Sequence, residues 1–249
     1  MSAMTLFLIL LGSLFVFMLL GEWIGVSLGV VGLIGLYIVA DGTKHFAAIS
    51  SILWNNCTTF TYTAIPLFIL MGELMIYSNL SAKFYASARL WLERMPGGLI
   101  QTNIFSCGVF AAISGSSPAT AAAIGSVAYP EMTKAGYNKS MTIGSLAGGG
   151  ALGILIPPSI TMIIYGAITE TSVDKLFIAG VMPGVLAVII FMLFIGISNL
   201  IRPNKFPPKS VRIPFLTKIK GSLGLLPFLS IIIVVLGGIY GGFTTPTEA

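Results

Sequence analysis

The segment from Met95 to Pro130 reads MPGGLIQTNIFSCGVFAAISGSSPATAAAIGSVAYP and contains no charged residue. A polar, turn-forming run, SGSSPAT, interrupts it from Ser114 to Thr120. A straight transmembrane helix needs about 20 apolar residues; the arm before the run (97–113) is barely long enough, and the arm after it (119–129) is too short. The segment therefore predicts a re-entrant hairpin, in which two half-helices enter and leave the membrane on the same side.

The polar tip of such a hairpin needs partners. Irregular backbone at membrane depth is tolerated only where it is buried in protein or lines a wet cavity. We therefore expect the tip to meet an ion or a substrate.

The rest of the chain is equally apolar, since 56% of its residues are hydrophobic and 8% are charged, against about 25% charged in soluble domains. Charge-free runs also cover 141–169, 176–201 and 221–247, and each is long enough to span a bilayer. The alternating segments of an outer-membrane barrel are absent from the sequence. The predicted class is an all-α integral membrane protein with spanning helices, one re-entrant hairpin and one broken helix.

Charge predicts the topology. Six of the thirteen basic residues lie between 202 and 220, where the sequence has no acid: Arg202, Lys205, Lys209, Arg212, Lys218 and Lys220. The positive-inside rule places this loop in the cytoplasm and residues 170–175 outside, and it favours ordinary membrane topology over nucleic-acid binding. No Lys or Arg precedes Lys44, so we expect a retained first helix and not a cleaved signal peptide.

Before the hairpin, apolar runs predict two spans (4–20 and 24–40) that place the N-terminus outside, and a third span at 58–77. Mixed segments at 42–56 and 81–95 predict helices that lie in the membrane interface. The second is expected to have Ser81 as N-cap and an apolar face of Phe84, Leu90 and Trp91. The predicted organisation is scaffold and arm helices in 1–96, a transport unit in 97–170, and spanning helices with the basic loop in 171–249.

A second interruption follows the hairpin, after a short polar turn predicted at 131–139. The centre of the run 141–169 reads SLAGGGALGILIPPSI. Three consecutive glycines and then Pro157-Pro158 are expected to break this helix, because proline lacks its N–H and restricts the residue before it.

Transporters build ion and substrate sites from discontinuous helices at the bilayer midplane. Neutral hydroxyl and carbonyl oxygens suit a singly charged hard cation, so we predict a Na⁺ site. Its candidate ligands are the hydroxyls of Ser114, Ser116, Ser117 and Thr120 and the carbonyls near Gly153, Ile156 and Pro158.

Other conspicuous residues have simpler interpretations. Gly148–Gly150 and Ala121–Ala123 favour close helix packing over ligation. Two interpretations of Glu73 stand side by side: a functional carboxylate at membrane depth and an interfacial residue. We expect Glu22 in a solvated turn, His45 to be an ordinary interfacial residue, and Cys57 and Cys107 to be inert packing residues.

Three runs carry a resemblance to a known family: AAISGSSPATAAAIGSVAYPEMTKAGYNK from Ala111, GALGILIPPSITMIIYGAITETSVDKLFIAGVMPG from Gly150, and GGIYGGFTTPTEA from Gly237. The chain resembles the large membrane subunit (DctM type) of tripartite ATP-independent periplasmic (TRAP) transporters. The resemblance implies an elevator-type, Na⁺-driven importer of a small organic acid or carboxylate in the bacterial inner membrane.

The same resemblance implies a small membrane subunit (DctQ type) and a periplasmic substrate-binding protein (DctP type) as partners. It also implies a sodium site between the SGSS and GILIPP segments. The family has two inverted repeats, and this chain contains only the first, so half of the substrate site would lie outside it.

Two alternatives are weaker. An intramembrane serine protease could use Ser114 or Ser116 as nucleophile but needs a base within hydrogen-bond reach, and His45 lies outside the predicted spans. A passive channel would need a wide polar pore or rings of charge, which these Gly-Ala-Ser segments do not supply. The predicted function is transport, and no enzyme activity is expected.

Overall fold

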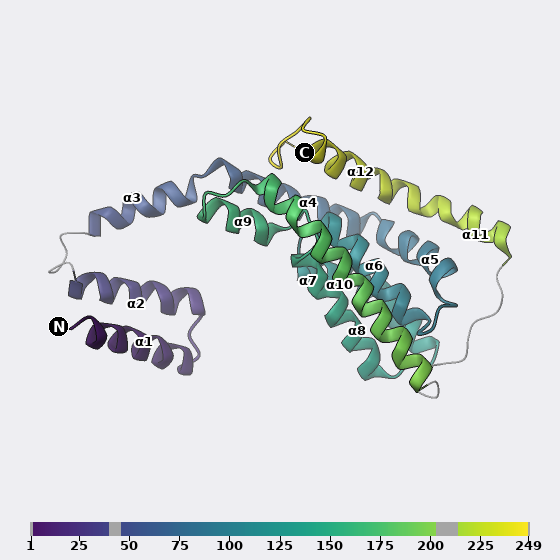
Figure 1. Cartoon of the computed structure of the whole chain (residues 1–249), viewed down its shortest axis with the longest axis horizontal. Coiled ribbons are helices and arrows are strands. Elements are labelled where there is room, and N and C mark those ends of the chain that lie inside the picture. The colour runs from purple at the N-terminus through teal and green to yellow at the C-terminus, as the bar shows by residue number, and fades with distance from the viewer. Residues whose placement is uncertain (1, 40–45, 203–213, 249) are drawn as a thin grey trace. The chain divides into compact units, whose positions relative to one another are not determined.

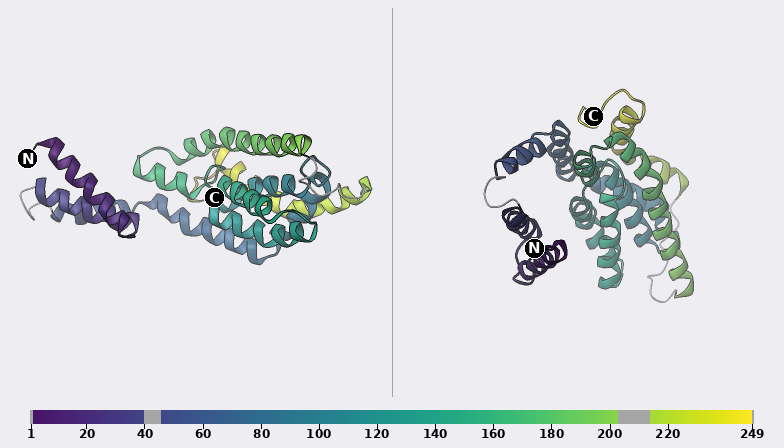
Figure 2. Two further views of the ribbon diagram at one scale, coloured as in Figure 1. Left: turned by 90° about the horizontal axis from the view of Figure 1, so that it is seen from below. Right: turned by 60° about the vertical axis from the view of Figure 1, so that its left-hand side comes forward.

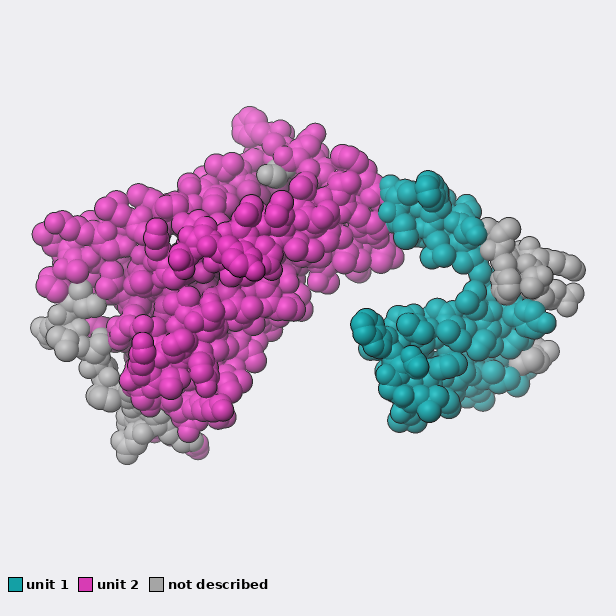
Figure 3. Space-filling model, turned by 180° about the vertical axis from the view of Figure 1, so that it is seen from behind, with its two compact units in different colours: residues 1–58 teal, residues 59–249 magenta. Residues whose placement is uncertain are grey.

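The computed structural model describes residues 2–39, 46–202 and 214–248, and the regular elements in these ranges are helices (Figure 1). The chain forms two compact units, residues 1–58 and residues 59–249 (Figure 3). The first contains α1 (Ala3–Leu19), α2 (Ile24–Val39) and α3 (Phe46–Cys57). Helices α1 and α2 are separate, as predicted, and contact each other. His45, predicted to be interfacial, lies outside the described residues. Cys57 is exposed, so the packing role predicted for Cys57 is wrong.

Among the described residues of the second unit, three stretches are long and apolar enough to cross a membrane: Phe60–Tyr77, Val173–Ile201 and Phe215–Tyr240. The first comprises η2 (Phe60–Thr63) and α4 (Ala64–Tyr77), and the second is α10. The third comprises α11 (Phe215–Ser222), η5 (Leu223–Leu225) and α12 (Leu226–Tyr240). These stretches fit the multi-pass membrane protein that the composition predicts.

A helical hairpin forms the centre of this unit. It consists of α6 (Leu99–Ser114) and α7 (Ser117–Lys134). Almost every residue of α6 is buried, because α4, α5, α7, α8 and α10 all contact it (Figures 1 and 2). A buried helix without a polar face is what a charge-free sequence requires.

The second arm of the hairpin is longer than predicted. Helix α7 continues through Pro130 to Lys134, so residues 131–134 are helical and not part of a polar turn. An internal proline costs about 3 kcal/mol or more in hydrogen bonding and sterics. Burial of Ala128 and Met132 on either side of it offsets this cost and explains why the helix continues.

Helix α5 (Leu80–Leu92) is also more buried than predicted. Its Phe84 stacks on Phe228 of α12, with ring centroids 4.4 Å apart, and Ser81 is buried inside the helix and not at its N-cap, which is Asn79. Trp91 instead contacts α11 through an edge-on contact to Phe215. Leu90 is the side chain nearest to Gly221 of α11. The predicted face of Phe84, Leu90 and Trp91 thus packs on successive parts of one helical stretch, Phe215–Tyr240, although Trp91 stays 42% exposed.

The broken helix is confirmed, although its glycines do not break it. Helix α8 (Lys139–Ala151) contains Gly148–Gly150, η3 (Leu152–Ile154) follows, and α9 (Ile160–Ile168) resumes after an irregular segment with a cis Pro157–Pro158 bond. A Cβ at Gly149 would lie 2.8 Å from Cys107 Sγ, and one at Gly150 would lie 2.8 Å from Ala121 Cβ. These two glycines allow α8 to pack closely on the hairpin, which is the packing role that the sequence favours.

Candidate functional site

The hairpin tip is a tight turn between two helix ends. Helix α6 ends at Ser114, and Gly115 follows in the left-handed conformation with φ +58°. Ser116 is the N-cap of α7, and its Oγ accepts a hydrogen bond from the Ala119 N–H at 3.5 Å. Pro118 lies in the first turn of α7, where its missing N–H costs nothing. The local sequence thus ends one helix and begins the next within two residues.

The tip contacts the break of the second helix. The N–H of Ile160 donates to the Gly115 carbonyl at 3.1 Å. A Cβ at Gly153 would lie 2.6 Å from the Ser116 carbonyl oxygen, and a Cβ at Gly115 would lie 2.8 Å from the Pro158 carbonyl oxygen. The two interruptions therefore meet, as the sequence predicts, and glycine is required on both sides of the contact.

Two of the predicted hydroxyl groups face each other inside the hairpin. Ser114 Oγ lies 2.6 Å from Thr120 Oγ1, and both side chains are buried. Ser114 Oγ also donates to the Ser116 carbonyl at 3.3 Å. Ser117 begins α7, and its backbone nitrogen is among the atoms that a Cβ at Gly153 would meet. Ser114, Ser116, Ser117 and Thr120 are thus within one turn of the contact with the break.

The break leaves backbone carbonyls next to the tip without the hydrogen bonds of a continuous helix. Ser159 Oγ donates to the Ile154 carbonyl at 2.8 Å, and the Leu152 carbonyl accepts from both Leu155 and Ile156. The described residues supply no comparable donor to the carbonyls of residues 155–158. These carbonyls, including those of Ile156 and Pro158, accept no hydrogen bond from the described residues. The side chain of Ile156 packs on Gly184 of α10, which holds the segment in place.

A cavity of ≈ 360 Å³ lies against the tip. Its lining comes from α4, from the tip and the first turns of α7, and from Ile160 at the start of α9. Glu73 of α4 lines it together with Ser114 and Ser116. Helix α4 can approach because Gly72 has no side chain: a Cβ there would lie 3.5 Å from the Ser114 Cα. Glu73, an exposed residue, thus lines the same cavity as two of the serines of the tip.

The donor set at this site consists of hydroxyls, carbonyls and one carboxylate. Within the described ranges, no three or more His, Cys, Asp or Glu side chains are grouped to hold a metal ion. Oxygen donors of this kind match hard cations and not the soft ligands of transition metals. The two helices that begin here, α7 and α9, also direct their N-terminal ends, with partial positive charge, toward this region.

The open end of the hairpin is fixed by contacts that the sequence did not predict. Arg89 of α5 forms hydrogen-bonded ion pairs with Glu93 and with Glu131 of α7. The Tyr137 hydroxyl accepts from the Leu99 N–H at 2.9 Å and donates to the Gly97 carbonyl at 3.3 Å. Burial raises the pKa of Tyr137, so the hydroxyl stays protonated and can donate. Arg89 and Glu93 have the i,i+4 spacing of a helical ion pair. Sequence spacing gives no sign of the Arg89–Glu131 pair or of the Tyr137 contacts, because they join segments about forty residues apart.

Residues 11–249 match the family described as "Tripartite ATP-independent periplasmic transporter, DctM component". The C4-dicarboxylate TRAP transporter large permease protein DctM of Pseudomonas aeruginosa is 41% identical over 90% of this chain and 51% of its own length. The isethionate TRAP transporter permease protein DctMQ of Oleidesulfovibrio alaskensis is 36% identical over 97% of this chain and 37% of its own length. The ectoine TRAP transporter large permease protein TeaC of Halomonas elongata is 32% identical over 97% of this chain and 56% of its own length. The chain thus spans about half the length of the large permeases that it matches.

Proposed function

The chain belongs to the DctM-component family of tripartite ATP-independent periplasmic transporters, and on this premise we propose that it forms one half of a Na⁺-coupled importer. The transported substrate is a small organic acid or carboxylate, and the site of action is the bacterial inner membrane. The relatives named above act on C4-dicarboxylates, isethionate and ectoine. We therefore propose a class of substrate, small organic acids, and not a single compound.

One observation supports the Na⁺ site most directly: the hairpin tip lies against the break of the second helix. Hydroxyls of Ser114 and Thr120, carbonyls near Gly153, and the carbonyls of Ile156 and Pro158 lie on the two sides of this contact. Discontinuous helices in secondary transporters use such carbonyls and hydroxyls to bind Na⁺, and helix N-termini to bind anions. Binding of Na⁺ here would hold the tip and the break together and prepare the neighbouring cavity for an organic anion.

In this proposal, residues 97–170 move as the transport unit of an elevator, and the remaining helices form the scaffold and arms. A small DctQ-type subunit and a periplasmic DctP-type binding protein complete the transporter. The name of the Oleidesulfovibrio relative, DctMQ, supports an association with a DctQ-type component. The hairpin is re-entrant, so that α6 and α7 enter and leave on the cytoplasmic side.

The test is substrate uptake by the complete transporter in proteoliposomes, at varied Na⁺ gradients. Ser117→Ala removes a candidate ligand without altering the apolar arms. Ser116→Ala removes another but also the N-cap of α7, so thermal unfolding of this variant is measured alongside its uptake. Loss of about 1–1.4 kcal/mol, the scale of one hydrogen-bond-like contact, raises the Na⁺ concentration for half-maximal uptake about five- to tenfold. Ser126→Ala is the matched control, since the Ser126 hydroxyl bonds only within α7, to the Ala123 carbonyl at 2.8 Å.

Unchanged Na⁺ dependence in alanine variants of each of Ser114, Ser116 and Ser117 would place the ion site elsewhere. The same assay separates the alternatives. A channel would carry substrate in both directions without a Na⁺ gradient, and a protease would release cleaved peptide from a membrane substrate. The hydroxyl of Ser114 is engaged with Thr120 and not with a histidine or lysine base, which disfavours the protease.

A further inference from the structure

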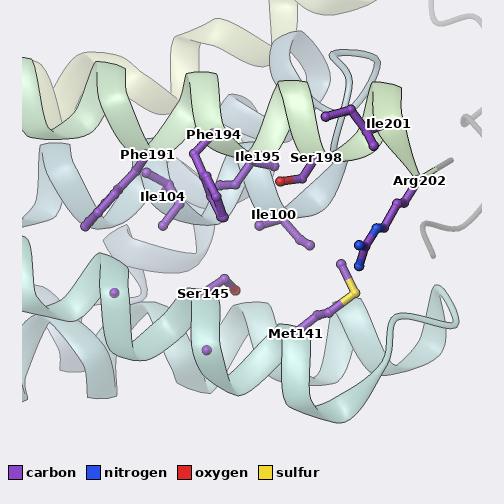
Figure 4. A pocket seen from close by; sticks show the side chains of 12 residues that line it. Ile100, Ile104, Met141, Ser145, Phe191, Phe194, Ile195, Ser198, Ile201 and Arg202 are labelled. Atoms are coloured by element: carbon purple, nitrogen blue, oxygen red, sulfur yellow. The ribbon is translucent and has the colours of Figure 1, made fainter.

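A second, larger cavity lies away from the tip. Its volume is ≈ 660 Å³, and it lies between α8 and α10, with α6 behind it (Figure 4). Its lining is mainly apolar, with Phe191, Phe194 and Ile195 of α10 facing Ile100 and Ile104 of α6. None of the predicted Na⁺ ligands lines it. We refer to it below as the α8–α10 groove.

The groove is open along α8 because of its glycines. A Cβ at Gly144 would meet no atom within 4 Å, whereas one at Gly148 would lie 4.0 Å from Phe191 Cε2. The helices therefore come together near Gly148 and leave free space toward Met141. From Phe191 to Arg202, α10 advances about 16 Å at about 1.5 Å per residue. This length equals about half of the ~30 Å hydrocarbon core, which is the depth of one leaflet.

The wide end of the groove is basic. Arg202 lines the cavity, and its side chain extends toward Met141 at that end (Figure 4). No acidic side chain in the described part of the chain forms an ion pair with it. In the sequence, Arg202 is the first of the six basic residues between 202 and 220, a stretch with no acid. An apolar channel one leaflet deep thus ends at the Arg202 guanidinium, which forms no ion pair within the described residues.

We propose that the α8–α10 groove binds an anionic phospholipid of the cytoplasmic leaflet. One acyl chain lies along Phe191 and Phe194, and the phosphate group is held by Arg202. Basic pockets between transmembrane helices on the cytoplasmic side are suited to anionic lipid head groups, and a guanidinium can bind a phosphate with two parallel hydrogen bonds. The bound lipid would fill the space between the broken-helix segment α8 and α10, and would stabilise their separation.

The test is native mass spectrometry of the complete purified transporter, titrated with phosphatidylglycerol or phosphatidylcholine that carry identical acyl chains. We expect tighter binding of phosphatidylglycerol, and Arg202→Gln should reduce this preference about fivefold, the effect of one basic residue near an anionic surface. Lys175→Gln is the matched control, because it removes the same charge from an exposed position in the first turn of α10. Equal effects of the two substitutions would overturn the proposal.

The groove itself is tested by filling it. Gly144→Leu places a side chain in the open space and should abolish binding of both lipids, whereas Gly237→Leu, at another open glycine on α12, should not. A phosphatidylglycerol with a diazirine at the acyl terminus should label residues 191–195 in the wild-type protein. Labelling only at other sites, or a protein segment found in the groove of the complete transporter, would show that the occupant is not a lipid. The labelling result stands even if the Gly144 variant does not fold.

Discussion

At the scale of single residues, the site depends on two glycines, at which the absence of a side chain allows a close backbone contact. Gly115 and Gly153 lie on opposite sides of the contact between tip and break, and each has a backbone carbonyl under 3 Å from where its Cβ would be. Backbone atoms cannot rotate away as the end of a flexible side chain can. The close approach of the two interruptions, and with it the common set of oxygen donors, therefore requires glycine at both positions.

Gly153→Ala tests this requirement. The added methyl would lie 2.6 Å from the Ser116 carbonyl oxygen, so the tip must move away from the break. We expect a loss of about 1–3 kcal/mol in stability, typical of overpacking, together with weaker Na⁺ dependence of uptake. Thermal unfolding of the purified transporter and the uptake assay measure the two effects.

Gly125→Ala is the matched control in the same hairpin. Its Cβ would make an ordinary contact of 3.6 Å with Leu146, and alanine stabilises a helix interior by about 0.5–1 kcal/mol relative to glycine. This variant should be as stable as the wild type or more so. Equal loss of stability in both variants would mean that the contact between Gly153 and the tip has no special role.

The residues that meet at the tip were predictable, but the residue that joins them from α4 was not. SGSSPAT and GILIPPS each interrupt an apolar run, so the need to satisfy polar backbone predicts that they meet. Glu73 lies in the apolar α4, and its spacing in the sequence does not indicate which helix packs beside it. The position of Glu73 at the cavity depends on the approach of Gly72 to Ser114. This is a tertiary contact, and no pattern in the neighbouring sequence predicts it.

At the scale of elements, α10 supports the break through a pair of small residues. Gly180 and Gly184 are one turn apart, and a Cβ at Gly184 would lie 2.8 Å from Ile156 Cγ1. A Cβ at Gly180 would lie 3.4 Å from the Leu155 carbonyl oxygen. Small residues four apart allow helix backbones to approach closely in membranes. Here they allow α10 to pack directly on the irregular segment between α8 and α9.

Gly184→Leu should therefore separate α10 from the break. The leucine side chain cannot fit against Ile156, so we expect lower thermal stability and a loss of uptake, with the protein still inserted in the membrane. Val185→Leu, next to it on an exposed position of α10, is the control and should behave like the wild type. Normal uptake by Gly184→Leu would show that the position of the break does not depend on α10.

The sequence predicts where helices are interrupted more reliably than where they end. Pro157-Pro158 removes two donors, and the break follows from this chemistry alone. Gly148–Gly150 lower helix propensity by about 1 kcal/mol each, but packing of α8 on the hairpin outweighs this loss, and the helix continues. In the same way, burial of Met132 extends α7 beyond Pro130. Long-range packing of this kind is not encoded in a local run of residues.

At the scale of the whole molecule, the chain presents large apolar surfaces. Met182, Phe194 and Leu200 of α10 are 79%, 69% and 72% exposed, although they belong to one of the helices long enough to span a membrane. Exposed apolar area of this extent marks contact with lipid or with further protein. Both are expected here, because the chain spans about half the length of its large-permease relatives.

The orientation of these helices follows from charge. Residues 202–220 contain six basic residues and no acid, whereas residues 170–175 contain one Lys and two acids. Since short basic loops stay in the cytoplasm, we predict that residues 202–220 are cytoplasmic and residues 170–175 periplasmic.

Cysteine labelling tests this orientation. In a version of the transporter without Cys57 and Cys107, a cysteine replaces Ser172 or Pro207. A membrane-impermeant maleimide added to intact cells should label Ser172→Cys and not Pro207→Cys, and permeabilised cells should show labelling at both. The reverse pattern in intact cells would show that the topology is opposite to the predicted one. The wide end of the α8–α10 groove would then lie in the outer leaflet.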